Sequence, residues 1–412
     1  DNSLLGLTPV EPSGLGLPMS QFDKDDMDPM GMLKLDVLGV RMQSAMAYAV
    51  REAERVRGEK IELDSIALDD PATFKAIRTT NTLGIFQIES PGQRELTGKH
   101  QPTEFNDLTI QISLFRPGPM KGNMIAPYLN GRQGFAKPDY IHRDLEPILK
   151  QTFGVVIFHE QVLRIFHKMT GCGLAKADEL RRQLEKPKAK SKIEAFFRKE
   201  ANARGYSASV IERVWSILEG FGSFGFCKAH GAAFAMPTYQ SAWLKTHYPV
   251  EFIAGLFTHD PGMYPRRLLL AEARRLGVPI LPLDVNRSTN EFLVEAIKPE
   301  SFGIRLSLAE VQGISDAEVN RIIDNQPFID LPDFYERARP NRRTAESLAA
   351  VGAFDSMVAG TRGDIAARIR ELNAQKRRPA PSADAVYLDF EVTDVMPTGN
   401  PEMSKMERVQ SE

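Results

Sequence analysis

The sequence has 412 residues, of which 42% are hydrophobic and 26% are charged, and its formal net charge is −2. This length predicts two to three domains of about 150 residues each, and the near-neutral charge excludes both a wholly basic, histone-like binder and an acidic disordered tail. No run approaches the roughly 18 apolar residues that a membrane span needs. Two cysteines, Cys172 and Cys227, are too few for a disulfide framework or a four-thiolate zinc site, so we expect a reducing, cytoplasmic environment.

The two ends of the sequence indicate a piece of a longer protein. The first residue is Asp1 and no signal-peptide pattern follows it, while Lys405–Glu412 has the pattern of a helix that stops part-way. We therefore expect an internal segment.

The first predicted elements are a loop, a strand and a helix. Residues 1–29 are rich in Gly, Pro and Asp, which predicts a loop. Met32–Val40 alternates and predicts a strand, whose two faces carry Leu33, Leu35 and Val37 on one side and Lys34, Asp36 and Leu38 on the other. Met42–Arg57 has the periodicity of an amphipathic helix.

Helices of about 8–20 residues are predicted from there to about residue 280, with one short strand at Gly154–Phe158. Prolines near residue 280 mark a boundary, and a smaller helix-rich unit follows to about Met357. It contains a possible pair of short helical hairpins between residues 304 and 356. Residues 374–402 are rich in Pro, Ala and Ser and predict a linker.

Lys34 and Asp36 are the first candidates for chemistry. Their spacing on a strand places both side chains on one face, roughly 7 Å apart along the backbone. A carboxylate there suits Mg²⁺ bound to substrate phosphates, and a neighbouring Lys suits the phosphates themselves. The alternative is a surface Asp near the end of an edge strand.

Residues 161–205 form a basic stretch with twelve Lys or Arg residues and five acids. Within it, Arg181 and Arg182 are adjacent, and guanidinium groups suit phosphate oxygens. On a helix the two side chains diverge by about 100°, so both reach one triphosphate only if the helix lies along it. The alternative is an exposed cationic helix.

Residues 220–235 interleave glycines with Phe and continue into Lys228, His230 and a run of small residues. This pattern indicates a loop and a flat helix face that a planar base or another helix can approach closely. The alternative is a tightly packed helix pair. A metal site at Cys227 and His230 lacks enough further ligands, and the zinc-protease pattern that His159 and Glu160 begin lacks its second His.

Leu308–Asp316 is a Gly-bearing turn that precedes a helix. Backbone N–H groups at such a helix start can bind an anion, with Gly313 and Ser315 at the turn. Val351–Phe354 is a candidate for the second member of a pair. The alternative is that Ser315 is an ordinary N-cap.

Taken together, these segments resemble the alpha subunit of bacterial DNA polymerase III, the C family of DNA polymerases. The matching segments, in chain order, are SQFDKDD at 20–26, LKLDVLGV at 33–40, GIFQIES at 84–90, LFRPGPM at 114–120, FGVVIFHEQV at 153–162, ADELRRQLEK at 177–186, FGFCKAHGAAFA at 224–235 and YQSAWLKTHYPVEF at 239–252. The CKAH wording, PGMYPRRLL at 261–269 and LDVN at 283–286 are more similar to the second, error-prone type of alpha subunit.

The resemblance implies a multidomain, mainly helical chain with a small α/β part. It would contain the end of a palm related to polymerase beta (1–45), helical fingers (46–295), a tandem helix-hairpin-helix element (296–360) and a linker toward a missing C-terminal region (361–412). Asp36 matches the third of three palm aspartates that bind two Mg²⁺ ions, and Lys34 matches a lysine close to the triphosphate. The other two aspartates lie upstream in the family.

Further site residues follow from the same resemblance. Arg181 and Arg182 match a pair that faces the incoming triphosphate, and Lys228 and His230 fall in the fingers motif near the nucleotide. The family usually has Met-Gly-Lys-Lys shortly after its Arg pair, whereas this chain has Leu-Glu-Lys-Pro at 184–187. The helix-hairpin-helix element would hold duplex DNA by its backbone, with Gly313 and Ser315 in a Gly-Ile-Ser turn that replaces the more usual Gly-x-Gly.

The implied function is template-directed DNA synthesis from dNTPs, in replication or in error-prone repair. The implied partners are primer-template DNA, the sliding clamp and other replication or repair proteins, with Mg²⁺ as cofactor and no membrane. We expect the chain alone not to polymerise, because Asp36 by itself cannot hold two metal ions. The alternative is a non-catalytic DNA-binding or scaffold protein, and a metal-dependent hydrolase is a third; triphosphate binding with and without Mg²⁺ would discriminate them.

Overall fold

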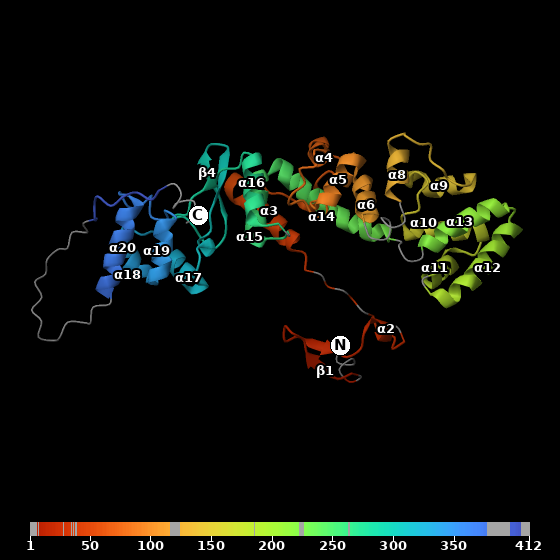
Figure 1. Ribbon diagram of the computed structural model, residues 1–412, viewed down its shortest axis with the longest axis horizontal. Coiled ribbons are helices and arrows are strands. Elements are labelled where there is room, and N and C mark those ends of the chain that lie inside the picture. The colour runs from red at the N-terminus through yellow and green to blue at the C-terminus, as the bar shows by residue number, and fades with distance from the viewer. Residues whose placement is uncertain are drawn as a thin grey trace, which may run out of the picture. The chain divides into compact units, whose positions relative to one another are not determined.

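The structure is a computed structural model that describes residues 6, 8–27, 29–33, 35, 37, 39–115, 124–184, 186–221, 226–262, 264–376 and 396–404. The chain divides into two compact units, Asp1–Val40 and Arg41–Glu412 (Figure 1). No helix in these ranges is long and apolar enough to cross a membrane.

The first unit contains a small hairpin and a short helix. Strand β1 (Val10–Pro12) pairs antiparallel with β2 (Pro18–Ser20), and Gly16 turns the chain between them at φ +75°. Helix α2 (Lys24–Met27) follows directly. The composition of residues 1–29 therefore predicted their turns but not this hairpin.

The predicted strand at Met32–Val40 is wrong for the residues of that segment that the structure describes, because none of them is in a strand. A strand needs a partner for its backbone N–H and C=O groups. The described residues Leu33, Leu35 and Val37 are instead strongly exposed, with 81% of Leu33 accessible to solvent. Lys34 and Asp36 lie outside the described residues.

A pair of closely packed helices opens the second unit. Helix α3 (Arg41–Arg57) confirms the prediction at Met42–Arg57 and packs against α15 (Pro249–His259). The two backbones approach so closely at Gly255 that a Cβ there would lie 2.3 Å from the carbonyl oxygen of Ala45. Glycine is therefore required for this contact.

Helix α14 (Lys228–His247) is the longest described helix and organises its neighbours. The elements that precede it in the chain are η1 (Leu63–Ser65), α4 (Pro71–Arg78), α5 (Pro91–His100), α6 (Phe105–Leu114) and α8 (Ile125–Arg132). Helices α4 and α6 pack on α14 around a core that includes Phe74, Ile112 and Tyr239. This core also buries Ile85 and Ile88, which belong to the turn between α4 and α5.

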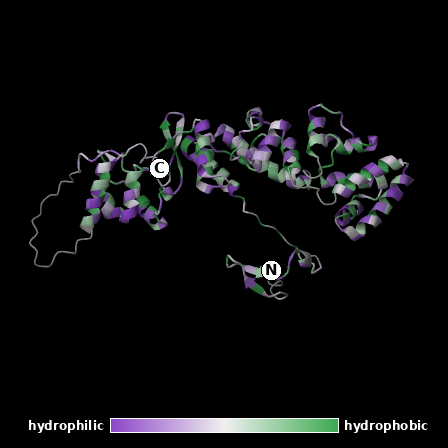
Figure 2. Ribbon diagram, viewed as in Figure 1, coloured by the Kyte–Doolittle hydropathy of each residue, from purple (hydrophilic) through white to green (hydrophobic). Residues whose placement is uncertain are grey.

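A second helical cluster carries the basic stretch (Figure 1). Its elements are η2 (Arg143–Leu145), α9 (Glu146–Leu149), η3 (Lys150–Thr152), α10 (His159–Thr170), α11 (Leu174–Leu184), α12 (Pro187–Ala203) and α13 (Ala208–Phe221). They share one apolar core in which Phe166, Phe197 and Trp215 are buried. Hydrophilic residues lie along the other helix faces (Figure 2).

The predicted strand at Gly154–Phe158 is wrong: the segment makes a single parallel bridge, between Phe158 and Phe226. The reason is local. The side-chain oxygen of Gln161 accepts hydrogen bonds from the backbone N–H groups of Ile157 (2.8 Å) and Phe158 (3.0 Å). These donors are therefore used by a helix-capping side chain and cannot extend a strand ladder.

A small sheet follows α16 (Arg266–Arg275) and was not predicted. Its strands are β3 (Ile280–Leu281), β4 (Leu293–Lys298) and β5 (Ser301–Arg305), in the order β3-β5-β4. Strand β5 pairs parallel with β3 and antiparallel with β4. The Glu52 carboxylate of α3 accepts a hydrogen bond from the Val294 backbone N–H (2.9 Å), which fixes the sheet to the helix pair.

The last described part is a helical subdomain with its own core around Phe328, Phe334 and Phe354. Its elements are η4 (Leu308–Glu310), α17 (Asp316–Asp324), α18 (Leu331–Ala338), α19 (Arg342–Ala350) and α20 (Arg362–Lys376). Residues 396–404 return to the start of α20, where Asn400 donates two hydrogen bonds to Asp364. The intervening part of the predicted linker, residues 377–395, lies outside the described residues.

Candidate functional site

A cavity of about 440 Å³ lies at the start of α14. It is lined by Gln151, Phe158, Glu160, Gln161, Arg164, Lys228, Ala229 and Ala232. The backbone N–H of Lys228 donates to both carboxylate oxygens of Glu160, each at 3.1 Å. A carboxylate is stabilising there because the first turn of a helix presents free N–H groups and a partial positive charge.

Two cations line this cavity. The Lys228 ammonium donates to the side-chain oxygen of Gln151 at 2.7 Å and lies 5.6 Å from the ring centroid of Phe158. Arg164 projects from α10, is exposed, and has no hydrogen-bond or ion-pair partner among the described residues. Among the described residues that line the cavity, Glu160 is the one carboxylate beside these two cations, so this wall suits an anionic group such as phosphate.

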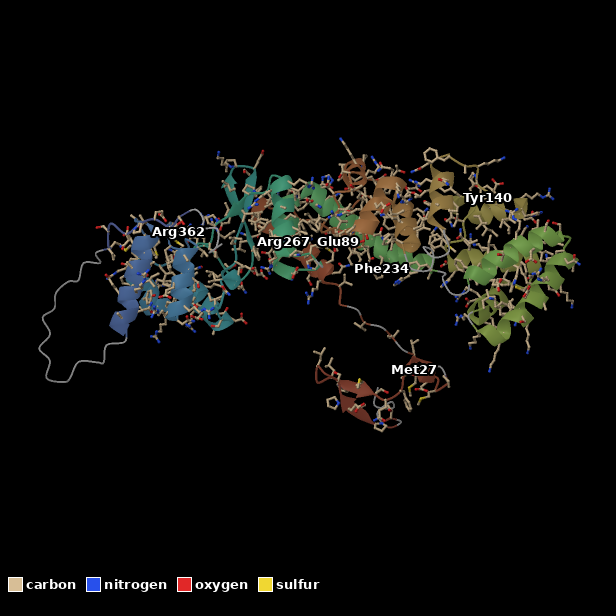
Figure 3. The ribbon with its side chains drawn as sticks, viewed as in Figure 1. Met27, Glu89, Tyr140, Phe234, Arg267 and Arg362 are labelled. Atoms are coloured by element: carbon tan, nitrogen blue, oxygen red, sulfur yellow. The ribbon has the colours of Figure 1, made fainter. Side chains whose placement is uncertain are left out.

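His230 lies two residues after Lys228, in a row of aromatic rings. Its ring centroid is 5.2 Å from that of Phe226 and 4.6 Å from that of Phe234. On the other side, Phe234 (labelled in Figure 3) stacks on Phe86 with centroids 5.7 Å apart and planes inclined by 22°. Sequence reasoning found His230 but missed Phe86, which comes from a turn about 140 residues earlier in the sequence.

The small residues of α14 lie on two faces of the helix, one packed against α6 and one exposed. A Cβ on Gly231 would lie 2.7 Å from the hydroxyl oxygen of Ser113 on α6, so this position is a close helix–helix contact. The alternative of a tightly packed helix pair is therefore confirmed there. Ala229 and Ala233 are exposed and leave the outer face of the helix flat.

Arg181 and Arg182 share one carboxylate in α11. Their Nη2 atoms lie 3.1 Å and 2.8 Å from the two oxygens of Asp178. Partial burial raises the pKa of Asp178, but hydrogen bonds from both guanidinium groups outweigh it and lower that pKa below its ordinary value. The spacing of three and four residues could have identified this partner from the sequence.

The two arginines differ in exposure: 72% of the Arg182 side chain is accessible and 15% of the Arg181 side chain. No hydrogen bond or ion pair joins either of them to Lys228 or His230 within the described ranges. The structure thus brings Lys228 and Arg164 to one cavity and places the arginine pair on a separate carboxylate.

Gly313 and Ser315 lie before α17. Gly313 has φ +84°, a conformation that L residues rarely adopt. The Ser315 hydroxyl accepts from the Glu318 N–H (3.3 Å), and the Glu318 carboxylate accepts from the Ser315 hydroxyl at 3.0 Å, so the N-cap interpretation is confirmed. The nearest atom to a Cβ on Gly313 would be Nε of Arg343, at 3.6 Å, and this exposed guanidinium was missed by sequence reasoning.

The proposed metal ligand Asp36 is among the residues that the structure leaves undescribed. Within the described ranges, no group of three or more His, Cys, Asp or Glu side chains is arranged to hold a metal ion. These residues therefore do not form a metal site by themselves.

Comparisons with protein families agree with this arrangement. Residues 42–205 match the family model of the bacterial DNA polymerase III alpha subunit finger domain, and residues 277–364 match that of the helix-hairpin-helix motif. The chain belongs to the family of bacterial DNA polymerase III alpha subunits. The two matches confirm a finger domain and a helix-hairpin-helix region, in the predicted order.

Within this family, the chain is similar to proteins named error-prone DNA polymerase, as the resemblance predicted. It is 34% identical to that of Symbiobacterium thermophilum over 97% of the chain, 34% identical to that of Dechloromonas aromatica over 91%, and 37% identical to that of Bdellovibrio bacteriovorus over 86%. These alignments cover 40%, 38% and 34% of the respective relatives, so the chain spans about two fifths of their length or less.

Proposed function

We propose that this chain is the fingers and helix-hairpin-helix part of a DNA polymerase that extends a primer from dNTPs in error-prone repair synthesis. The observation that carries the proposal is the similarity over 97% of the chain to a protein named error-prone DNA polymerase. In the proposed reaction the primer 3′-hydroxyl attacks the alpha-phosphate of the nucleotide in line.

The cavity at the start of α14 is the proposed site for the triphosphate. Lys228 and Arg164 offer two positive charges from different helices, and His230 follows Lys228 by two residues on α14. Charge-assisted hydrogen bonds to phosphate oxygens would orient the nucleotide there. The Glu160 carboxylate holds the helix start and would keep the Lys228 backbone in place.

Arg181 and Arg182 receive different roles in this proposal. Most of the Arg182 side chain is exposed, so it can turn toward a triphosphate while Arg181 retains its ion pair with the Asp178 carboxylate. Arg181 is largely covered, so its main contribution is to position α11. The basic stretch of residues 161–205 then supplies one nucleotide-binding arginine and one positioning arginine.

Residues 1–45 are proposed to be the C-terminal part of a palm, with Asp36 as one ligand for Mg²⁺ and Lys34 near the phosphates. The described residues do not form a metal site without Asp36.

The helix-hairpin-helix region, proposed to span residues 296–360, would hold duplex DNA by its phosphates. Gly313 gives the turn before α17 its shape, and Arg343 brings a cation beside it. Contacts of this kind recognise the phosphate backbone and carry no base sequence. The proposed partners are therefore primer-template DNA and dNTPs.

Primer extension by the intact protein tests the proposal. We expect Asp36→Asn to abolish extension and to leave DNA binding nearly unchanged. Extension by this variant at the wild-type rate, or no extension by the wild type, would instead favour the DNA-binding scaffold.

The two arginines are compared in the same assay. Arg182→Ala should weaken dNTP use about ten- to a hundredfold, because a charge-assisted hydrogen bond contributes about 1.5–3 kcal/mol. Lys199→Ala is the matched control, since it removes an exposed cation from α12 of the same basic stretch. A change in DNA affinity alone for Arg182→Ala would place this residue on the DNA path.

A further inference from the structure

We propose that the aromatic row formed by His230, Phe234 and Phe86 is a stacking surface for unpaired bases of a DNA template strand. The inference rests on the proposed function, because template-directed synthesis supplies a single strand next to the fingers. It adds a binding surface for the template to the nucleotide cavity described above.

The row offers outward ring surfaces on which bases can stack. The His230 and Phe234 ring centroids lie 4.6 Å apart with planes inclined by 53°, and those of Phe234 and Phe86 lie 5.7 Å apart with planes inclined by 22°. Because the rings contact one another, bases would stack on their outward surfaces and not between them. His230 is exposed, and Phe234 and Phe86 are partly exposed. Ala229 and Ala233, next to His230 and Phe234 in the sequence, are exposed and short, so neither of them extends over the rings.

Phe86 is held in place by an elaborate set of contacts. The turn of residues 81–89 is anchored by Ile85 and Ile88, which are buried on either side of Phe86. The hydroxyl of Ser241 accepts from the Phe86 backbone N–H at 3.1 Å. The Lys245 ammonium, also on α14, donates to the carbonyls of Asn81 (2.9 Å) and Leu83 (2.6 Å).

These contacts fix the turn to the same helix that carries Phe234. The two rings therefore meet in a preformed arrangement, and binding to it costs little ordering of side chains. The next residue, Gln87, is exposed and has φ +63°, so the turn keeps an unfavourable backbone conformation while it presents Phe86 outward.

The positive charges near the aromatic row favour a nucleic acid strand over a protein as the partner that binds there. The row begins at His230, two residues after Lys228 on α14, and the cavity to which Arg164 contributes a second cation lies at the start of the same helix. Stacking rings beside a cationic groove are the combination by which proteins bind single-stranded nucleic acid. A protein partner would instead favour large aliphatic groups, and Phe135 and Ile329, which are strongly exposed in the unit Arg41–Glu412, are not part of the row.

The test separates bases from phosphates. Fluorescence anisotropy would measure binding of the 412-residue chain to a labelled oligo-dT and to an abasic oligonucleotide of the same length. We expect oligo-dT to bind about tenfold more tightly, since stacking on an aromatic side chain contributes about 1–3 kcal/mol per base.

Four variants locate the stacking. Phe234→Leu and Phe86→Leu should reduce the oligo-dT affinity toward the abasic value and leave the abasic affinity unchanged, whereas Lys228→Gln should weaken both. Phe234→Tyr keeps a ring and should retain the preference for bases. Phe135→Leu is the matched control, because Phe135 is an aromatic residue with 79% exposure in a separate loop.

Equal affinity of the wild type for the two oligonucleotides would overturn the inference. The inference would also be overturned if Phe135→Leu lost the preference for oligo-dT over the abasic oligonucleotide. It would be overturned as well if both Phe234→Leu and Phe86→Leu kept that preference. These outcomes are distinct from a failure of the proposed function, which would appear as absent primer extension by the intact protein while the base preference of this chain persists.

Discussion

Replacing Lys245 by Met tests how the turn of residues 81–89 is held on α14. Only 5% of this side chain is accessible, and its ammonium contacts the Glu272 carboxylate (2.6 Å) as well as the carbonyls of Asn81 and Leu83. Met has a similar length and no charge, so the substitution removes the contacts and largely keeps the volume.

The expected loss of unfolding free energy is about 3 kcal/mol. Removing one partner of a buried ion pair costs about 3–5 kcal/mol, chiefly because it leaves an uncompensated charge. Here Glu272 retains Arg275, whose Nε and Nη2 atoms donate to it at 2.8 Å and 2.7 Å, which places the cost at the lower end. The carbonyls of Asn81 and Leu83 would lose a buried donor.

The loss should grow with pH. Burial lowers the pKa of Lys245 from its ordinary 10.5 to about 8, although Glu272 opposes this shift. Between these two values the unfolded state binds more protons than the folded state, so this group makes the wild type more stable as pH rises. From pH 7 to pH 9.5 the difference between wild type and Lys245→Met should therefore widen by about 2 kcal/mol.

Urea denaturation of both proteins at several pH values measures this difference. Lys99→Met is the control, because Lys99 forms an exposed pair with Glu95 and its removal should not change stability measurably. A Lys245→Met variant as stable as the wild type would refute the expected loss, because leaving the Glu272 carboxylate and the two carbonyls without the ammonium donor would then cost no stability. A difference that narrows with pH would refute the assigned pKa direction.

Two further predictions concern other parts of the chain. Gly313→Ala should cost about 1–2 kcal/mol of stability, because an L residue disfavours φ +84°, and should weaken duplex binding. Gly220→Ala is the control and should do neither, because no described atom beyond its chain neighbours and its own helix backbone lies within 4 Å of the new Cβ. Burial, with help from the Arg132 charge, lowers the pKa of His100 to about 4. Stability should then fall by about 2 kcal/mol from pH 7 to pH 5 as the unfolded state gains a proton, and the pH slope in urea denaturation should diminish in His100→Gln.

Helices were predictable from the sequence where one face repeats locally. Met42–Arg57 shows this, since its buried residues Met42, Ala45, Met46 and Ala49 follow the helical period. Strands were not predictable from the sequence, because a strand forms only with a partner strand, and a local sequence pattern does not show which segment that partner is. Strand β5 pairs with β3 from more than 20 residues earlier, whereas the apolar run at Gly154–Phe158 uses its donors on Gln161.

The same distinction applies to the site. The motif around Lys228 and His230 identified the start of α14, and the resemblance identified Arg181 and Arg182. Arg164 could not be found this way, because the fold alone brings α10 to the first turn of α14. A resemblance transfers residue types at matched positions, but it does not say which of them already have an intramolecular carboxylate.

The contact between Asn400 and Asp364 has a consequence for how the chain can vary. It closes a ring in which the two ends of residues 364–400 are joined by hydrogen bonds, so the fold fixes the separation of those ends and not the number of residues between them. The entropy of closing such a ring changes slowly, by about 0.6 kcal/mol for each doubling of its length. Insertions and deletions between the end of α20 at Lys376 and Asn400 should therefore be tolerated among relatives more readily than in the helical cores, which include Ile365 and Ile369 of α20.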